Sequence, residues 1–290
     1  MNGLAAGIAL ALAASLALNT GYLFEHSGLT RGPDIDLRHP LATLRWMFAS
    51  RPWLAGLALA TFGWALHVGA LSKAPLSVVQ AFVAGGLVLA LPIGRLMFSQ
   101  PLGRTERRGI CVLAGALALL ALGIHEHGAH GSFHSTRLAL YLGTSLAAAA
   151  LLVVAPARGR RAPILGLAGG LLYGAADVAI KALTGIASSH GLGHALLTGW
   201  LVVAVAATLA AAYCFQRGLQ IGPALPVIAL MTAGTNALSI VAGFVVFGDP
   251  LGRTPGLAAV HAIALVVIVV AATRLAPATQ TERKLVPVAT

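Results

Sequence analysis

The sequence predicts an all-α polytopic membrane protein with nine transmembrane helices, arranged as two inverted four-helix repeats plus one extra helix. Three observations lead to this fold class. The 290-residue chain is 58% hydrophobic and only 9% charged, and so few charges cannot cover a water-facing surface. Its apolar residues fall into runs of about 20, the length of helix that crosses the hydrocarbon core of a bilayer. Two stretches of the sequence also repeat at a nearly fixed spacing.

Nine apolar segments are long enough to cross a bilayer, and lipid requires them to be helical because a helix satisfies its own backbone. The first segment has no basic stretch before it, so we expect a retained helix and not a cleaved signal peptide. Pro75 suits the start of the third span, where its missing N–H would be unpaired in any case. The predicted spans are 3–24, 53–71, 75–97, 108–124, 137–155, 163–187, 194–214, 224–247 and 256–274.

The distribution of Lys and Arg predicts the orientation of these spans. If the N-terminus is outside, fifteen of the 19 basic residues lie on the inner side and three lie outside, with Lys181 inside a span. Cytoplasmic loops of membrane proteins carry this excess of basic residues. We therefore expect a multi-pass protein of the cytoplasmic membrane with its N-terminus outside and its C-terminus inside. The net charge of +11 then orients the helices and does not indicate a nucleic-acid partner.

The inner segment 37–52 is too charged to span but has apolar residues at helical spacing. We expect an amphipathic helix at the membrane surface, with Trp46 at headgroup level; an irregular loop is the alternative. The apolar residues are Leu41, Leu44, Met47 and Phe48.

The repeat joins the two halves of the chain. LSKAPLSVVQAF from Leu71 aligns with LQIGPALPVIAL from Leu219, and FSQPLGRT aligns with FGDPLGRT about 149 residues later. The offset of five helices is odd, so the two copies point in opposite directions, as in many secondary transporters. The expected units are a first repeat 1–124, a His-rich external loop 125–136, an extra span 137–155, a second repeat 156–275 and a disordered cytoplasmic tail 276–290.

These residues resemble the drug/metabolite transporter superfamily, EamA-type proteins included, and within it the NIPA-like magnesium transporters. The resemblance rests on WLAGLALATFGWALHVGALSKAPLSVVQ, GLLYGAADVAIKALTGI and FQRGLQIGPALPVIALMTAG, and it covers about 250 residues. It implies a nine-helix carrier with Mg²⁺ or another divalent cation as cargo. Members usually have an acidic residue in the turn before the last helix of each half. Asp249 fits this pattern, whereas Gln100 departs from it.

Polar residues inside the predicted spans are the candidates for the transport pathway. Asp177 and Lys181 are the two charged ones, and their spacing of four places them on one helical face. Asp177 is expected to bind a proton or a cation, with Lys181 as its counter-charge or as an anion ligand; a self-neutralising structural pair is the alternative. The other candidates, each also able to form a plain interhelical hydrogen bond, are Asn19, Tyr22, Trp64, His67, Gln80, Tyr173, Thr232 and Asn236.

The predicted external loop, HEHGAHGSFHSTR, offers a second candidate site. Four imidazoles beside Glu126 could bind Zn²⁺ or a similar metal, although a solvated loop is the favoured explanation. These side chains are His125, His127, His130 and His134.

The leading function is a secondary transporter that moves a small solute or a cation, Mg²⁺ included, by alternating access. An exporter of an organic metabolite or amphiphile coupled to protons is the alternative, and a non-transporting membrane enzyme or accessory protein is the second. The sequence has no Walker A motif and no G-x-S-x-G or H-E-x-x-H motif, so we expect no enzyme activity and no cofactor. The expected partners are the lipid bilayer and the transported solute, with a homodimer as a further option.

Overall fold

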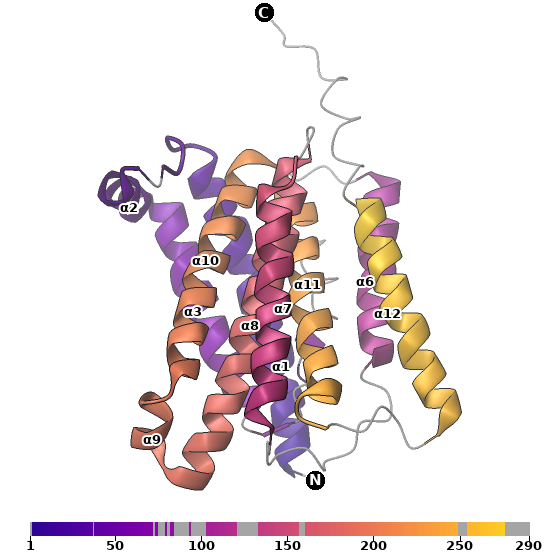
Figure 1. Cartoon of the computed structure of the whole chain (residues 1–290). Coiled ribbons are helices and arrows are strands. Elements are labelled where there is room, and N and C mark those ends of the chain that lie inside the picture. Colours follow the sequence, from indigo (N-terminus) through magenta and orange to yellow (C-terminus); the bar gives the residue numbers. More distant parts are fainter. Residues whose placement is uncertain are drawn as a thin grey trace, which may run out of the picture.

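The computed structural model describes residues 2–36, 38–71, 73–74, 79, 82–83, 93, 103–120, 133–156, 160–248 and 254–275. Within these residues the regular structure is helical throughout (Figure 1). The helices are α1 (Asn2–Leu29), α2 (Pro40–Ala49), α3 (Arg51–Leu71), α6 (Arg104–Leu120), α7 (Ser135–Val154), α8 (Arg161–His190), α9 (Leu192–Leu196), α10 (Gly199–Ile221), α11 (Ala224–Val245) and α12 (Pro255–Leu275).

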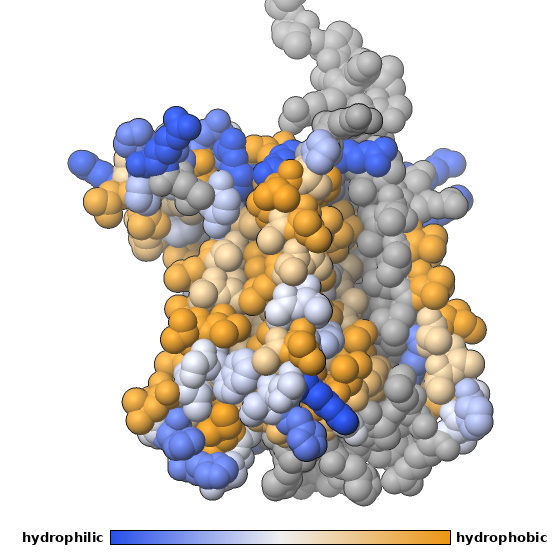
Figure 2. All heavy atoms as spheres, in the orientation of Figure 1, coloured by the Kyte–Doolittle hydropathy of each residue, from blue (hydrophilic) through white to orange (hydrophobic). Residues whose placement is uncertain are grey.

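Six of the described helices are long and apolar enough to cross a membrane: α1, α3, α7, α8, α10 and α11. A further apolar stretch among the described residues is Pro255–Ala264 at the start of α12. Hydrophobic side chains surround the middle of the bundle and hydrophilic ones gather at its two ends on the face seen in Figure 2. This is the surface of a multi-pass membrane protein, because lipid faces the middle and water faces the ends. The third predicted span, 75–97, lies almost wholly outside the described residues.

Helix α8 forms the centre of the bundle and packs against α7, α10 and α11. Its glycines at every fourth position let the backbone of α11 come close. A Cβ at Gly166 would lie 2.8 Å from the Val227 carbonyl oxygen, and one at Gly170 would overlap that of Met231. Thr235 adds a hydrogen bond of 3.0 Å to the Gly170 carbonyl. The small-residue stripe therefore holds α8 directly on α11.

Helices α1 and α3 form a second close pair by the same means. A Cβ at Gly21 would lie 2.8 Å from the backbone of α3, at Gly56 and Ala60. A Cβ at Gly56 would lie 2.7 Å from the Glu25 Cγ. The absence of a side chain at Gly56 thus leaves the room that the Glu25 side chain occupies.

The short helix α2 lies at the end of the bundle opposite the start of α1 (Figure 1). Pro40 occupies its first turn, where a missing N–H costs nothing. Met47 and Thr43 are buried, whereas Leu41 is 81% exposed and Phe48 is 53% exposed. At the opposite end, Gly191 with φ 88° ends α8 and allows α9 to begin at once.

Candidate functional site

A cavity of about 670 Å³ opens inside the bundle among α1, α2, α3, α8, α10 and α11. It runs along α3 from Trp53 to His67. Fourteen residues of helix correspond to roughly 21 Å, so the cavity extends from the end where α2 lies deep into the span. A volume of this size is in the range of small-ligand sites.

The structure brings most of the predicted pathway residues together in the wall of this cavity. Eight of them line it: Asn19, Tyr22, Trp64, His67, Tyr173, Asp177, Thr232 and Asn236. Lys181 lies one turn beyond Asp177 on α8; it is 8% exposed and does not contribute to the wall. Gln80 lies outside the described residues.

The predicted histidine site falls mostly outside the described residues, since His125, His127 and His130 are not among them. His134 is exposed and precedes the first turn of α7, without a side-chain capping bond. Among the residues that the structure describes, no three His, Cys, Asp or Glu side chains are grouped closely enough to hold a metal ion.

The wall contains functional groups that sequence reasoning missed, and the clearest is a three-helix hydrogen-bond network around Gln216 on α10. Its Nε2 donates to Glu25 Oε2 on α1 at 2.6 Å. The indole Nε1 of Trp53 on α3 donates to its Oε1 at 3.2 Å. Because the indole N–H can only donate, it fixes which way the Gln216 amide points. Glu25, which is 2% exposed, is therefore held by a donor of fixed orientation.

Both Glu25 and Gln216 lie just beyond the predicted span ends, 24 and 214. The expectation that only Asp177 and Lys181 are charged residues inside the spans was therefore wrong. The apolar run stops at Glu25, yet α1 continues to Leu29, because neighbouring helices supply partners for its polar side chains. The sequence did contain a signal that Glu25 faces the cavity: it follows the candidate Tyr22 by three residues and so shares a helical face with it.

The aromatic packing around Phe215 connects the two helices that carry the buried carboxylates. Tyr22 on α1 meets the Phe215 ring edge-on with centroids 4.8 Å apart, and Tyr173 on α8 does so at 6.4 Å. Glu25 lies one turn from Tyr22, and Asp177 lies one turn from Tyr173. The carboxylates of Glu25 and Asp177, which are 152 positions apart in the sequence, thus line one cavity from two different helices.

The wall is acidic although the chain is basic. Three of the chain's eight acidic residues line the cavity, namely Glu25, Asp36 and Asp177. In the part of the chain that the structure describes, no Lys or Arg lines it. Asp36 lies at the α2 end, where hydrogen bonds from the His39 ring (2.9 Å) and the Arg38 backbone N–H (2.8 Å) hold the pKa of its carboxyl below the ordinary value. The cavity therefore attracts positive charge.

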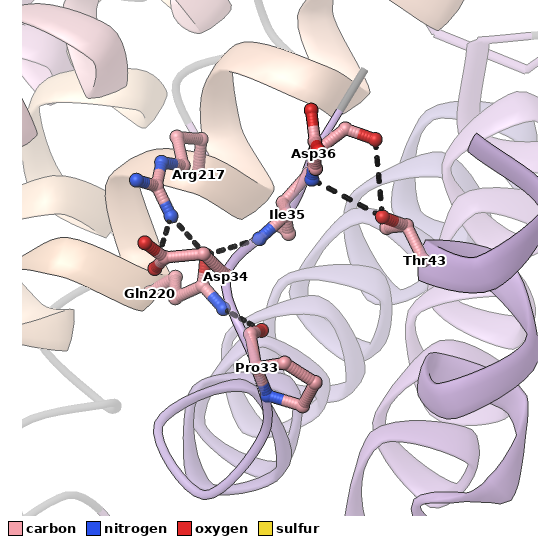
Figure 3. A network of polar contacts seen from close by, with 7 residues as sticks. All are labelled: Pro33, Asp34, Ile35, Asp36, Thr43, Arg217 and Gln220. Carbon is pink, nitrogen blue, oxygen red and sulfur yellow. Dashed lines mark hydrogen bonds and ion pairs between the residues drawn. The ribbon is translucent and has the colours of Figure 1, made fainter. Parts of the chain in front are cut away.

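At the same end, residues 33–36 between α1 and α2 form a strap that is tied to the last turns of α10 (Figure 3). Arg217 donates to Asp34 Oδ1 at 2.7 Å. Gln220 donates to the Pro33 carbonyl at 2.7 Å and accepts from the Ile35 N–H at 2.9 Å. The backbone N–H of Asp36 donates to Thr43 Oγ1 on α2 at 3.1 Å. These bonds place Ile35, Asp36 and α2 against the mouth of the cavity.

The inner end of the cavity, away from α2, contains buried polar atoms with no hydrogen-bond partner among the described residues. They include Asn19 Oδ1, His67 Nδ1 and both amide atoms of Asn236. Asn19 is 3% exposed and Asn236 is 1% exposed. Unpaired buried polar atoms are uncommon in folded proteins, and these atoms are available to hydrogen-bond a polar ligand or water.

Comparison with known proteins supports a transporter. The chain is similar to the "Probable magnesium transporter NIPA9" of Arabidopsis thaliana: the two are 25% identical over 265 residues, which cover 86% of this chain and 75% of that protein. No family model matches the chain, and no solved structure matches it. The similarity supports a NIPA-like membrane transporter. A transporter as relative also agrees with the expectation that the chain is not an enzyme.

Proposed function

We propose that the chain is a secondary transporter of the drug/metabolite transporter superfamily that carries Mg²⁺ across the cytoplasmic membrane. The acidic wall is the observation that carries this proposal: three carboxylates and no described Lys or Arg line a cavity in a chain of net charge +11. Hard divalent cations bind to carboxylate and amide oxygens. Glu25 and Asp36 supply the additional carboxylates that a single Asp177 could not provide. The similarity to a magnesium transporter points to the same cargo.

Alternating access follows from two inverted repeats that rock against each other. The duplication pairs α1 with α8 and α3 with α10. The packing supports this pairing, since α1 packs against α3 and α8 packs against α10. Helix α8 ends beside α9 at the end of the bundle where α1 begins, so α1 and α8 run in opposite directions (Figure 1). The cavity lies between these two pairs, as expected for a site at the interface between repeats.

In the orientation with the N-terminus outside, α2 and the strap lie on the cytoplasmic side. The mouth at Asp36 then opens toward the cytoplasm. The exposed apolar side chains of α2, Leu41 and Phe48 among them, suit a helix that lies at the membrane surface.

Mg²⁺ flux into liposomes that contain the purified protein tests this function, with a trapped Mg²⁺ indicator as the readout and empty liposomes as the control. We expect protein-dependent flux that the Asp177→Asn variant lacks. Absence of flux from protein that elutes as a single species and melts cooperatively would contradict the Mg²⁺ cargo.

The aromatic part of the wall favours a second candidate, an exporter of an organic metabolite or amphiphile coupled to protons. Organic cations are bound by ring faces as well as by carboxylates. The aromatic wall residues are Tyr22, Trp53, Trp64, Tyr173, Tyr213 and Phe215. The same liposomes distinguish this candidate, because its flux requires a proton gradient and an organic solute instead of Mg²⁺.

A further inference from the structure

A chain of hydrogen bonds fixes the side-chain amide of Asn19. Ser15 Oγ donates to the Val83 carbonyl at 2.6 Å. Asn19 Nδ2 donates to the Ser15 carbonyl at 2.8 Å and to Ser15 Oγ at 3.1 Å. A backbone carbonyl can only accept, so the nitrogen of this amide must face Ser15. Asn19 Oδ1 is therefore directed away from Ser15, and it is a buried acceptor without a described partner.

Asn236 presents a second buried amide to the same cavity from α11, with both of its polar atoms unpaired among the described residues. Leaving such atoms unsatisfied costs roughly 1–3 kcal/mol per group. Two of these amides in one cavity indicate that a polar ligand satisfies them when it is bound. Asp177 lines the same cavity and adds a carboxylate.

The spacing of the carboxylates determines which form of a cation fits. No three acidic or imidazole side chains among the described residues are close enough to ligate one ion directly. A divalent ion here would therefore retain much of its water shell, and Mg²⁺ gives up water reluctantly. At about 30 Å³ per water, an ion with six waters occupies roughly 200 Å³. A cavity of about 670 Å³ holds such a complex.

We infer that the inner end of the cavity is a binding site for a hydrated divalent cation. Asn19 Oδ1 and Asn236 Oδ1 accept hydrogen bonds from the waters of the ion, and Asp177 balances its charge. Ser15 does not touch the ion. It is a positioning residue, because its backbone carbonyl and its Oγ accept hydrogen bonds from Asn19 Nδ2 and so keep the acceptor oxygen of Asn19 turned toward the site. This inference rests on the proposed cation cargo and adds to it the residues that recognise the cation.

Mn²⁺ binding tests the site directly, because Mn²⁺ prefers the same oxygen ligands as Mg²⁺. The free Mn²⁺ signal in electron paramagnetic resonance is measured while full-length protein in nanodiscs is titrated, and Mg²⁺ is then added as competitor. We expect Asn19→Leu and Asn236→Leu each to weaken binding by about tenfold or more. The control Ser239→Ala removes another buried unpaired polar atom of α11 that lies outside the wall, and it should bind like wild type.

A double-variant comparison separates positioning from a general structural effect. Ser15→Ala removes the 3.1 Å bond from Asn19 Nδ2 to Ser15 Oγ but keeps the 2.8 Å bond to the Ser15 backbone carbonyl, so it should weaken Mn²⁺ binding less than Asn19→Leu does, by about three- to fivefold. In an Asn19→Asp background the same change should not alter Mn²⁺ binding, because the carboxylate has no N–H to donate to Ser15 Oγ and both of its oxygens accept. If the Ser15 hydroxyl only supports the fold, Ser15→Ala will reduce Mn²⁺ binding by the same factor in both backgrounds.

The outcomes distinguish this site from the transport function itself. Wild-type Mn²⁺ affinity in folded Asn19→Leu and Asn236→Leu proteins, together with intact Mg²⁺ flux by wild type, would overturn the site and leave the transporter. Weakened binding in both variants, with flux reduced in parallel, supports site and function together. A wild-type protein that neither binds Mn²⁺ nor moves Mg²⁺ would overturn both.

Discussion

Gln216 on α10 donates a 2.6 Å hydrogen bond to the carboxylate of Glu25 on α1 while its other amide atom accepts from Trp53 on α3. One side chain on α10 thus joins α1 and α3, whose partner residues precede it by 191 and 163 positions. The network also places a buried carboxylate between the mouth of the cavity at Asp36 and its inner end at Asp177. A cation entering past α2 would meet Asp36 first, then Glu25 and finally Asp177.

The charge of Glu25 can be removed without removing its hydrogen bond. In Glu25→Gln the side-chain carbonyl still accepts from Gln216, so the protein should fold normally. The loss of one buried negative charge should reduce Mg²⁺ flux in liposomes by about tenfold or more, equivalent to at least 1.4 kcal/mol of cation binding. Wild-type flux in this variant would remove Glu25 from the pathway.

Removing the side-chain amide of Gln216 should lower the stability of the protein, whereas Glu25→Gln should not. Gln216→Leu leaves the Glu25 carboxylate and the Trp53 indole N–H without their partner, and a buried unsatisfied group costs about 1–3 kcal/mol. We expect a lower melting temperature in detergent than for wild type. Thr144→Ala, at an exposed position of α7, is the control and should melt like wild type.

A substitution of Asp177 tests whether the inner end of the cavity takes part in transport. Asp177→Asn preserves the shape of the side chain but removes its charge, so we expect transport to be abolished while expression and folding are retained. Mg²⁺ flux and elution profile are measured on the same preparation. Glu106→Gln, a substitution on α6, controls for the loss of any acidic residue. Equal flux in Asp177→Asn and wild type would exclude Asp177 from the mechanism.

The sequence was sufficient to predict the class of protein and much of the cavity wall. Apolar runs of helical length lead directly to membrane helices, and polar residues inside such runs face other helices because lipid does not solvate them. Asn19, His67 and Asn236 were found in this way. The predicted spans end at 24 and 214, just before the polar side chains of Glu25 and Gln216, which is why these two residues were missed.

The strap and the hydrogen-bond partners of its individual atoms could not be predicted from the sequence. Residues 33–36 look like an ordinary polar connection, and their bonds to Arg217 and Gln220 cross more than 180 residues of chain. No periodicity encodes such a contact, since it depends on how α1 and α10 meet in three dimensions. Lys181 shows a related limit of sequence reasoning: it shares a helical face with Asp177, but one turn farther along α8 it does not line the cavity.

The close packing of α8 on α11 predicts a clear contrast between two glycines. A Cβ at Gly170 would overlap the Met231 carbonyl, whereas a Cβ at Gly143 on α7 has no neighbour within 4 Å. Gly170→Ala should therefore destabilise the protein by about 1–3 kcal/mol through overpacking. Gly143→Ala should be neutral or should stabilise by up to about 1 kcal/mol because alanine favours helix. Melting temperatures of the two variants that do not differ would contradict the close approach.

The strap makes a prediction about amide exchange. Gln220→Leu removes the acceptor of the Ile35 N–H, so deuterium uptake in peptides covering residues 30–39 should rise by about tenfold. Arg217→Ala should raise uptake less, by under about fivefold, because its ion pair with Asp34 is exposed to solvent. Arg107→Ala, at an exposed position on α6, should leave uptake unchanged.

The pH dependence of the strap follows from the same ion pair. The hydrogen bond and charge of Arg217 lower the pKa of Asp34 below its ordinary value. A carboxyl whose pKa is lower in the folded state contributes stability at pH values above its ordinary pKa and loses it as pH falls through the lowered pKa. Uptake in residues 30–39, corrected for the intrinsic exchange rate, should therefore stay constant between about pH 6 and 8. A rise in corrected uptake across this neutral range would mean that a group other than Asp34 controls the strap.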